Sequence, residues 1–123
     1  MNNNRFAFII EDDIKLATIF AYALEEVQFR TETAQDGRKA LARLAEIVPD
    51  VIVLDLHLPF VSGMEVLKSI RADGRLANVP VILATADAIL GESLRDEADL
   101  VLLKPISIRQ LQKLTERLMA TSS

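Results

Sequence analysis

The sequence contains no cysteine and no tryptophan, and it has a single histidine among its 123 residues. The absence of cysteine excludes disulfide bonds, which is typical of proteins in a reducing cytoplasm. No apolar run approaches the ~20 residues that a membrane-spanning helix needs, and the first residues lack the pattern of a signal peptide. We therefore expect a cytoplasmic protein that does not bind a membrane.

Basic clusters are also missing, because the 14 lysines and arginines are scattered and outnumbered by 18 acidic residues. The net charge of −4 and the lack of a basic block disfavour direct binding of nucleic acid by this chain. Half of the residues are apolar and 26% are charged, as in ordinary globular proteins. A chain of this length suits one domain, which we expect over residues 1–123 with its core at about 5–119.

Apolar segments that resemble strands alternate five times with segments of helical periodicity. The strand-like segments are residues 6–10, 29–34, 51–54, 81–85 and 100–103. Apolar positions three or four residues apart indicate helices at about 14–27, 40–48, 66–73, 89–95 and 108–118, and residues 119–123 resemble a frayed end or a linker. This alternation predicts an α/β fold: a parallel sheet with right-handed crossovers and helices on both faces.

Side chains capable of chemistry stand at the ends of four of the predicted strands. Glu11 and Asp12 follow the first strand, Asp55 follows the third, Thr85 ends the fourth and Lys104 follows the fifth. The carboxyl ends of parallel strands meet at one edge of the sheet, where doubly wound folds bind their ligands. We therefore expect these five side chains to share one cleft.

Three carboxylates in one cleft repel one another unless a cation or a raised pKa offsets their charge. Magnesium suits such a site, since it prefers oxygen ligands, keeps several waters and often bridges to a phosphate; Mn²⁺ fits the same donors. We expect Asp12 and Asp55 to ligate the metal directly and Glu11 to act through water. The backbone carbonyl of His57, two residues after Asp55, would supply a further oxygen.

The lysine and the threonine of the predicted cleft suit an anion rather than the metal. Lys104 would pair with Asp55 or with an anion bound to it, and the hydroxyl of Thr85 can donate to a phosphoryl oxygen. A carboxylate nucleophile, a divalent cation, an ammonium and a hydroxyl together predict transfer of a phosphoryl group onto Asp55.

These residues give the chain a resemblance to the receiver domain of bacterial two-component response regulators. The matching segments are residues 8–13, 53–59 with Gly63, 81–86 and 103–105, and the resemblance covers residues 5 to about 119. It implies a flavodoxin-like (βα)5 fold with the strand order 2-1-3-4-5.

The resemblance also implies a role for each residue of the cleft. Asp55 would accept the phosphoryl group of a histidine kinase phosphohistidine, and Glu11 and Asp12 would form the acidic pair for magnesium. Thr85 would be the switch hydroxyl, and Lys104 would pair with the phosphoryl group.

Three features depart from the family pattern. Receivers usually carry tyrosine or phenylalanine three residues before the lysine, whereas this chain has Val101, so the usual coupling of that aromatic to Thr85 cannot operate. The stretch from Thr85 to Lys104 is about three residues shorter than the family suggests, and Glu97-Ala98 stands where Gly-Ala is usual. These departures predict intact phosphoryl chemistry and an altered output face.

Two residues occupy equivalent positions beside the cleft: His57 lies two residues after Asp55, and Asp87 lies two residues after Thr85. In receivers, these two positions flank the phosphoryl group, and Ala86, between Thr85 and Asp87, flanks the same pocket. We hypothesise that His57 and Asp87 face each other and modulate hydrolysis of the aspartyl phosphate.

Other functions were weighed against a phosphorylated signalling domain. A phosphatase of the haloacid dehalogenase type needs a second acid two residues after its nucleophile, where this chain has His57, so we expect no turnover of an external substrate. A phosphorelay intermediate, or a receiver that binds its partner constitutively, stays open because of Val101.

The expected partners follow from the resemblance. A histidine kinase or phosphotransfer protein would donate the phosphoryl group, and an output domain or a partner protein would respond to it. Arg109, Lys113 and Arg117 form a basic stripe on the last helix, which is either a solvated face or a docking surface for an acidic partner or a second copy. A homodimer would use the face formed by the fourth helix, fifth strand and fifth helix.

Overall fold

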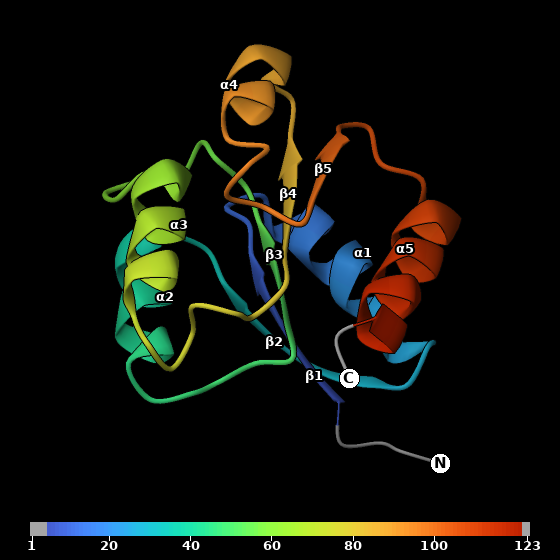
Figure 1. The fold of residues 1–123 in the computed structure, drawn as a ribbon. Coiled ribbons are helices and arrows are strands. Elements are labelled where there is room, and N and C mark those ends of the chain that lie inside the picture. The colour runs from blue at the N-terminus through green and yellow to red at the C-terminus, as the bar shows by residue number, and fades with distance from the viewer. Residues whose placement is uncertain (1–4, 122–123) are drawn as a thin grey trace.

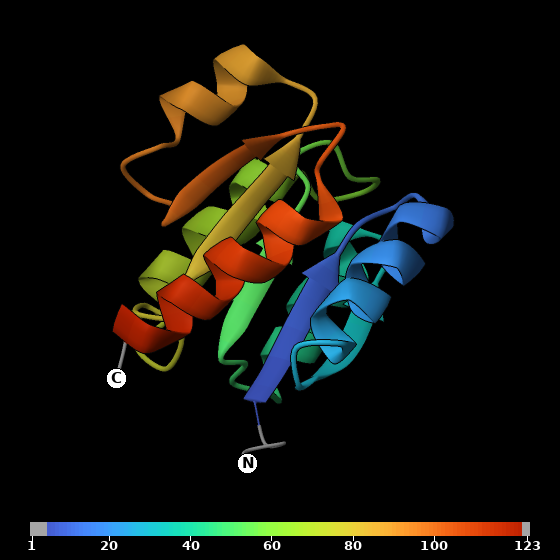
Figure 2. The same ribbon diagram turned by 90° about the vertical axis from the view of Figure 1, so that its right-hand side faces the viewer.

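The computed structural model describes residues 5–121, which form a five-stranded parallel sheet between two layers of helices (Figures 1 and 2). The strands are β1 (Arg5–Ile10), β2 (Phe29–Ala34), β3 (Val51–Leu54), β4 (Val81–Thr85) and β5 (Leu100–Leu103). The helices are α1 (Ile14–Glu25), α2 (Gly37–Leu44), α3 (Gly63–Ala72), α4 (Ala88–Ser93) and α5 (Ile108–Thr121). The strand order β2-β1-β3-β4-β5 confirms the predicted flavodoxin-like fold.

Each face of the sheet has its own apolar core. Residues of α2, α3 and α4 pack on one face, and residues of α1 and α5 pack on the other (Figure 1). Successive side chains of a strand point to opposite faces. In β1, Phe8 and Ile10 therefore enter the first core, whereas Ala7 and Ile9 enter the second. Burial on both faces explains why β1 and β3 are continuous apolar runs rather than alternating ones.

The predicted helices all form, but several of their ends differ from the sequence-based prediction. Helix α2 ends at Leu44 rather than near Val48, because Pro49 disfavours helix before it and Arg75 donates to the freed carbonyl of Leu44 at 2.7 Å. Helix α5 includes residues 119–121, so the predicted frayed end is wrong there: Met119 packs against the second core. Residues 122 and 123 lie outside the described residues.

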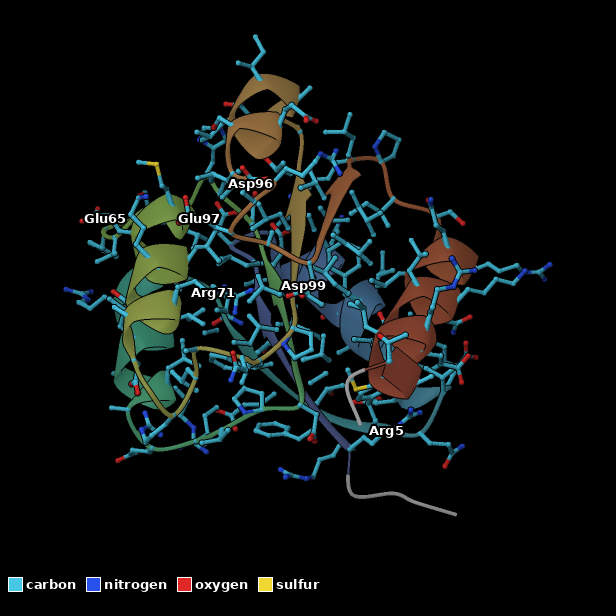
Figure 3. All side chains as sticks on the ribbon, viewed as in Figure 1. Arg5, Glu65, Arg71, Asp96, Glu97 and Asp99 are labelled. Atoms are coloured by element: carbon cyan, nitrogen blue, oxygen red, sulfur yellow. The ribbon has the colours of Figure 1, made fainter. Side chains whose placement is uncertain are left out.

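One arginine fixes the segment before β5. Arg71 of α3 donates to the carbonyls of Ala77, Val79 and Glu97 and pairs with Asp99 at 3.1 Å (Figure 3). The carboxylate of Asp99 also accepts a hydrogen bond of 2.7 Å from the backbone N–H of Val81, at the start of β4. Arg71 thus positions the segment in which Glu97-Ala98 replaces Gly-Ala. Its partners are mostly backbone carbonyls, which leave no pattern in the sequence.

Candidate functional site

The acidic side chains and the lysine meet at the carboxyl ends of the strands. Glu11, Asp12 and Asp55 each offer one carboxylate oxygen, and these oxygens all lie within 4.8 Å of one another. The ammonium of Lys104 lies 2.8 Å from Oε1 of Glu11 and 3.3 Å from Oδ2 of Asp55. The backbone N–H of Lys104 donates to the carbonyl of Thr85 at 2.9 Å, so all five predicted residues lie at one edge of the sheet.

Asp55 is held by the backbone on both sides. Its N–H donates to the carbonyl of Ile10 at 2.9 Å, which continues the β1–β3 pairing one residue beyond β3. The backbone N–H of His57 lies 3.4 Å from Oδ1 of Asp55 and donates a long hydrogen bond to it. Gly63 at the start of α3 approaches so closely that a Cβ there would lie 2.1 Å from the carbonyl oxygen of Asp55. A glycine is required at this contact, and the backbone of Asp55 is thereby held between β1 and α3.

Glu11 is the most deeply buried charge of the cleft, with 1% of its surface exposed. Burial raises the pKa of its carboxyl above the usual value, against the opposing effects of Lys104 and of the Asp13 N–H. That N–H donates to Oε2 at 3.1 Å, while Oε1 contacts the Lys104 ammonium as an ion pair. The Asp13 carboxylate accepts hydrogen bonds from the N–H groups of Lys15 and Leu16 and caps α1.

Lys104 stays charged despite its partial burial. Burial alone would lower its pKa, but its contacts with Glu11 and Asp55 outweigh that effect and raise the pKa above the usual value. The Lys104–Pro105 peptide bond is cis. Through two ion pairs, the Lys104 ammonium lies beside the carboxylates of both Glu11 and Asp55.

Thr85 connects the cleft to α4. Its side chain is fully buried, and its Oγ1 accepts a hydrogen bond of 3.0 Å from the backbone N–H of Asp87, the N-cap of α4. Gly91 of α4 packs directly on this strand end: a Cβ there would lie 3.0 Å from a methyl of Val101 and 3.2 Å from the methyl of Thr85. With Val101 in place of an aromatic side chain, α4 lies close on β4 and β5.

His57 and Asp87 face each other across the rim, as the sequence predicted. Nε2 of His57 lies 3.0 Å from Oδ2 of Asp87. The N–H of Leu90 donates to the Asp87 carboxylate, and this cap, followed by the contact with His57, lowers the Asp87 pKa below its usual value. Ala86 between Thr85 and Asp87 is exposed.

The residues present fit a magnesium ion. The cluster supplies three carboxylates, the donor set that hard divalent cations prefer, and leaves room for water at the exposed carboxylate of Asp12. Oε1 of Glu11 is buried and accepts no hydrogen bond of good geometry from the described residues. A buried carboxylate oxygen with only an ion pair is a suitable position for a cation or for a water bound to one. The carbonyl of His57 remains a predicted ligand.

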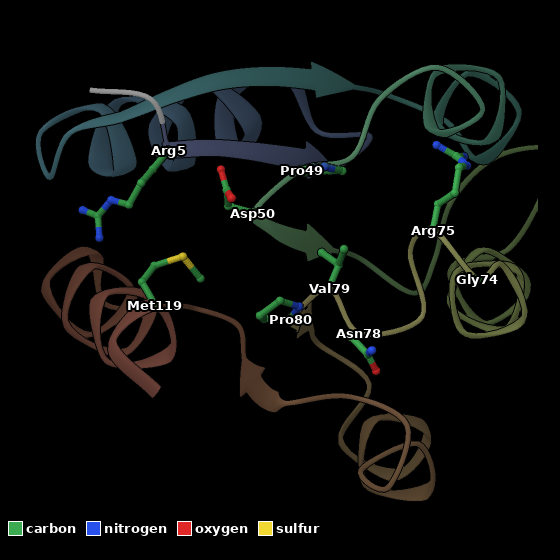
Figure 4. Close-up of a pocket in the computed structure, with 9 residues that line it drawn as sticks. All are labelled: Arg5, Pro49, Asp50, Gly74, Arg75, Asn78, Val79, Pro80 and Met119. Atoms are coloured by element: carbon green, nitrogen blue, oxygen red, sulfur yellow. The ribbon is translucent and has the colours of Figure 1, made fainter. Parts of the chain in front are cut away.

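A second hollow of about 430 Å³ lies at the opposite edge, near the amino ends of the strands (Figure 4). Its charged groups already have structural partners: the carboxylate of Asp50 accepts the N–H of Phe6, Arg5 donates to the carbonyl of Val27, and Arg75 donates to the carbonyl of Leu44. This hollow therefore has no cluster of charged side chains available for a ligand like that of the cleft, among the residues that the structure describes. In the part of the chain that is described, no helix is both long and apolar enough to cross a bilayer.

Comparison with known proteins points to a single family. The model of the response regulator receiver domain matches residues 7–116. The DNA-binding response regulator MtrA of Mycolicibacterium paratuberculosis is 34% identical over 108 residues, which cover 84% of this chain and 46% of that protein. The chain thus spans just under half the length of such relatives.

Solved structures of receiver domains superpose closely on this chain. The receiver domain of a Francisella response regulator has a TM-score of 0.87 at 31% identity and covers 98% of this chain and 100% of its own. The receiver domain of a sensor histidine kinase from Pseudomonas aeruginosa PAO1, with a magnesium ion coordinated in its active-site cleft, has a TM-score of 0.87 at 26% identity. That match covers 95% of this chain and 98% of the other.

Proposed function

The chain belongs to the response regulator receiver domain family of two-component systems, and on this premise we propose that Asp55 is its phosphoryl acceptor. The observation that carries the proposal is the contact of one ammonium, Lys104, with both Glu11 and Asp55 in a cleft of three carboxylates. Among these, Asp55 stands directly after the central strand β3, with Lys104 on one side. This is the arrangement that a carboxylate nucleophile for phosphoryl transfer requires.

The proposed reaction is a direct transfer. An oxygen of the Asp55 carboxylate attacks the phosphorus of a phosphohistidine, an O–P bond forms, and the P–N bond breaks with its electron pair left on the imidazole nitrogen. With acetyl phosphate as donor, the P–O bond to the acetyl group breaks instead and acetate leaves. Hydrolysis of the aspartyl phosphate by water returns the free carboxylate and inorganic phosphate.

The residues around Asp55 would each stabilise a different charged group in this reaction. Lys104 would pair with a phosphoryl oxygen in place of the Asp55 carboxylate. The hydroxyl of Thr85, which accepts from the Asp87 N–H, would turn to donate to another phosphoryl oxygen. Glu11 and Asp12, with Asp55 and the His57 carbonyl, would hold Mg²⁺ or Mn²⁺. When bound, that cation neutralises negative charge on the transferring phosphoryl group.

Labelling by a small phosphodonor tests this proposal. Acetyl phosphate with Mg²⁺ is expected to add one phosphoryl group, which intact-protein mass spectrometry detects, and chelation of Mg²⁺ is expected to prevent it. Asp55→Asn should abolish the label, because an amide is not a nucleophile here, whereas Asp50→Asn at the opposite edge should leave labelling intact. A label that persists in Asp55→Asn would disprove the assignment.

The contact between His57 and Asp87 closes the rim beside the acceptor, and we assign it control of phosphoryl lifetime. A closed rim restricts the approach of the hydrolytic water. The variants His57→Ala and Asp87→Ala should therefore shorten the half-life of the label to a similar extent. Unchanged half-lives in both variants would remove this role.

A groove beside the cleft is suited to a phosphodonor protein. It measures about 480 Å³ and is lined mainly by apolar residues of α1 and of the β5–α5 loop: Leu16, Ile19, Phe20, Lys104, Pro105, Ile106 and Ile108. Lys104 belongs to both the groove and the acceptor cleft, so a partner in the groove stands next to Asp55. A histidine kinase or phosphotransfer protein that presents its histidine on a helix fits this apolar surface.

The remaining assignments concern the protein to which the domain contributes. We propose one receiver domain over residues 1–123, located in the cytoplasm, that turns over no external substrate and binds no nucleic acid itself. An output domain or a partner protein would read its phosphorylated state. Exposed Ile89 of α4 and Leu103 of β5, with the basic stripe of α5, suit a homodimer face. Sedimentation with and without beryllofluoride tests that face: a monomer in both states would exclude it.

A further inference from the structure

The loop between β3 and α3 contains a strained turn. Phe60 has φ = 69°, and the N–H of Val61 donates to the carbonyl of Pro59 at 2.9 Å, which closes a three-residue turn around Phe60. This turn is rare, and a positive φ at a bulky residue costs free energy that surrounding contacts must offset. The loop follows Asp55 directly and includes His57, so its conformation bears on the acceptor.

Two consecutive residues of α2 hold this turn. The N–H of Gly37 donates to the carbonyl of Pro59 at 3.2 Å. Gly37 also lies so close that a Cβ there would be 1.9 Å from the carbonyl oxygen of Val61. The guanidinium of Arg38 lies over the ring of Phe60, 4.0 Å from its centroid. Pro59, Phe60 and Val61 are thus each in contact with the start of α2.

The contact of Arg38 is specific to this ring. Within residues 5–121, its guanidinium forms no ion pair and no hydrogen bond. Its electrostatic contact is the cation–π contact with the ring of Phe60. Phe60 is 72% exposed and does not enter either apolar core. Burial of apolar surface therefore does not explain the strained turn, whereas the cation–π contact gives it a partner.

We propose that Arg38 and Phe60 form a clasp that holds residues 57–62 in the conformation in which the acceptor site binds its metal and is phosphorylated. Arg38 is then a positioning residue: it acts through the loop, and the loop acts on Asp55 through the His57 N–H. The His57 carbonyl, which would be a ligand of a bound metal, belongs to the same loop. This inference rests on the proposed function of Asp55. It adds a site that lies outside the cleft and uses none of its charged residues.

Four variants and a control distinguish loss of the clasp from a general loss of stability of the domain. Arg38→Ala removes the cation, and Phe60→Leu removes the ring but keeps an apolar side chain at the same φ. The double variant tests whether both single variants lose the same contact. Phe60→Trp keeps an aromatic ring face and should preserve the clasp. Lys39→Ala is the control, because Lys39 is the next exposed cation on α2 and, within the described residues, forms no hydrogen bond or ion pair with the loop.

The first measurement needs no metal. Amide hydrogen exchange, followed by NMR in the presence of EDTA, should become faster at Val61 and Gly37 in Arg38→Ala and Phe60→Leu. The expected change is between about twofold and fivefold, the range of an exposed cation–π contact. Amides of β1 and β3 should keep their wild-type rates. Equal acceleration throughout the sheet, or rates equal to those of Lys39→Ala, would overturn the clasp.

The second measurement is Mg²⁺ affinity by calorimetric titration. The dissociation constant should rise by about twofold to fivefold in each single variant and no further in the double variant, because one contact is lost in all three. Additive losses, or affinities equal to wild type, would show that Phe60 serves another purpose, such as contact with a partner. If wild type is not labelled at Asp55, the proposed function fails while both comparisons of the clasp still stand. Normal labelling with unchanged loop exchange and metal affinity in Arg38→Ala overturns the clasp alone.

Discussion

At the residue scale, the cleft buries carboxylates, and their loss of hydration opposes folding. Glu11 and Asp55 are 1% and 5% exposed, and one ammonium serves both. Burial of a carboxylate costs free energy unless it is paired, and Lys104 pairs two acids at once. The metal-free domain therefore holds an excess of negative charge. This excess opposes folding, and it would favour a cation at the proposed metal site.

Neutralisation of Glu11 tests this balance through its pH dependence. The pKa of Glu11 is raised by burial, so between the usual value of 4.5 and the folded-state value the folded protein binds more protons than the unfolded chain. The free energy of unfolding contributed by Glu11 must then fall as pH rises through that window. In EDTA, urea unfolding from pH 4.5 to 8 should show Glu11→Gln gaining stability relative to wild type as pH rises.

The same variant should lose metal affinity. With one carboxylate removed, the Mg²⁺ dissociation constant should rise by about tenfold or more. Glu116→Gln is the control, because Glu116 is exposed on α5 far from the cleft, and it should change neither property. A stability difference between Glu11→Gln and wild type that does not depend on pH would contradict the assigned cause.

At the scale of single elements, two glycines decide where α3 and α2 start relative to Asp55 and the loop that follows it. Gly63 lets α3 begin against the carbonyl of Asp55, and Gly37 lets α2 begin against Val61. In both places the neighbouring atom is backbone, which cannot rotate away as a side chain can. The positions of α2 and α3, and with them the β3–α3 loop, are therefore set by the absence of a single carbon atom at each contact.

Replacement of a glycine by alanine should lower the free energy of unfolding strongly only where a backbone atom lies close to the added Cβ. Gly63→Ala places its Cβ 2.1 Å from the Asp55 carbonyl oxygen, so it should lower the free energy of unfolding by about 3 kcal/mol or more. Gly74→Ala should change it by less than about 0.5 kcal/mol, because no atom lies within 4 Å of the added carbon. Urea denaturation measures both, and equal effects of the two substitutions would refute the argument.

At the scale of the whole molecule, the fold places an apolar groove, the proposed surface for a protein donor, beside the carboxylate cleft. The groove of α1 and the β5–α5 loop borders the cleft through Lys104, and Ile19 of α1 leaves 44% of its surface exposed there. A small phosphodonor needs the cleft alone, whereas a protein donor must also cover the groove. The two reactions can therefore be separated by a change in the groove.

A charge in the groove should block protein donors selectively. Ile19→Glu should slow phosphoryl transfer from a cognate phosphohistidine protein by about tenfold or more, because an uncompensated carboxylate becomes buried in the complex. Labelling by acetyl phosphate should be unaffected. Val48→Glu is the matched control, since Val48 is a similarly exposed apolar residue outside the groove. Equal losses with both donors would show that the groove residue acts on the cleft instead.

Much of this protein can be predicted from its sequence, because the information is local. The apolar runs of β1 and β3 and the periodic helices predict a parallel α/β sheet, and the residues at the strand ends predict one cleft at its edge. Asp13, Asp36 and Ser62 each cap a helix by a contact within three residues along the chain. Such contacts depend on short-range geometry, so the sequence alone determines them.

Other features were decided only by tertiary structure, because their partners are distant in sequence and follow no pattern. Arg71 binds carbonyls up to 26 residues away, Gly91 fits against Val101, and Arg38 stacks on Phe60 22 positions later. Each contact depends on where whole elements lie after the sheet has formed. Periodicity reports which face of an element is buried; it does not report which side chain on another element will be found there.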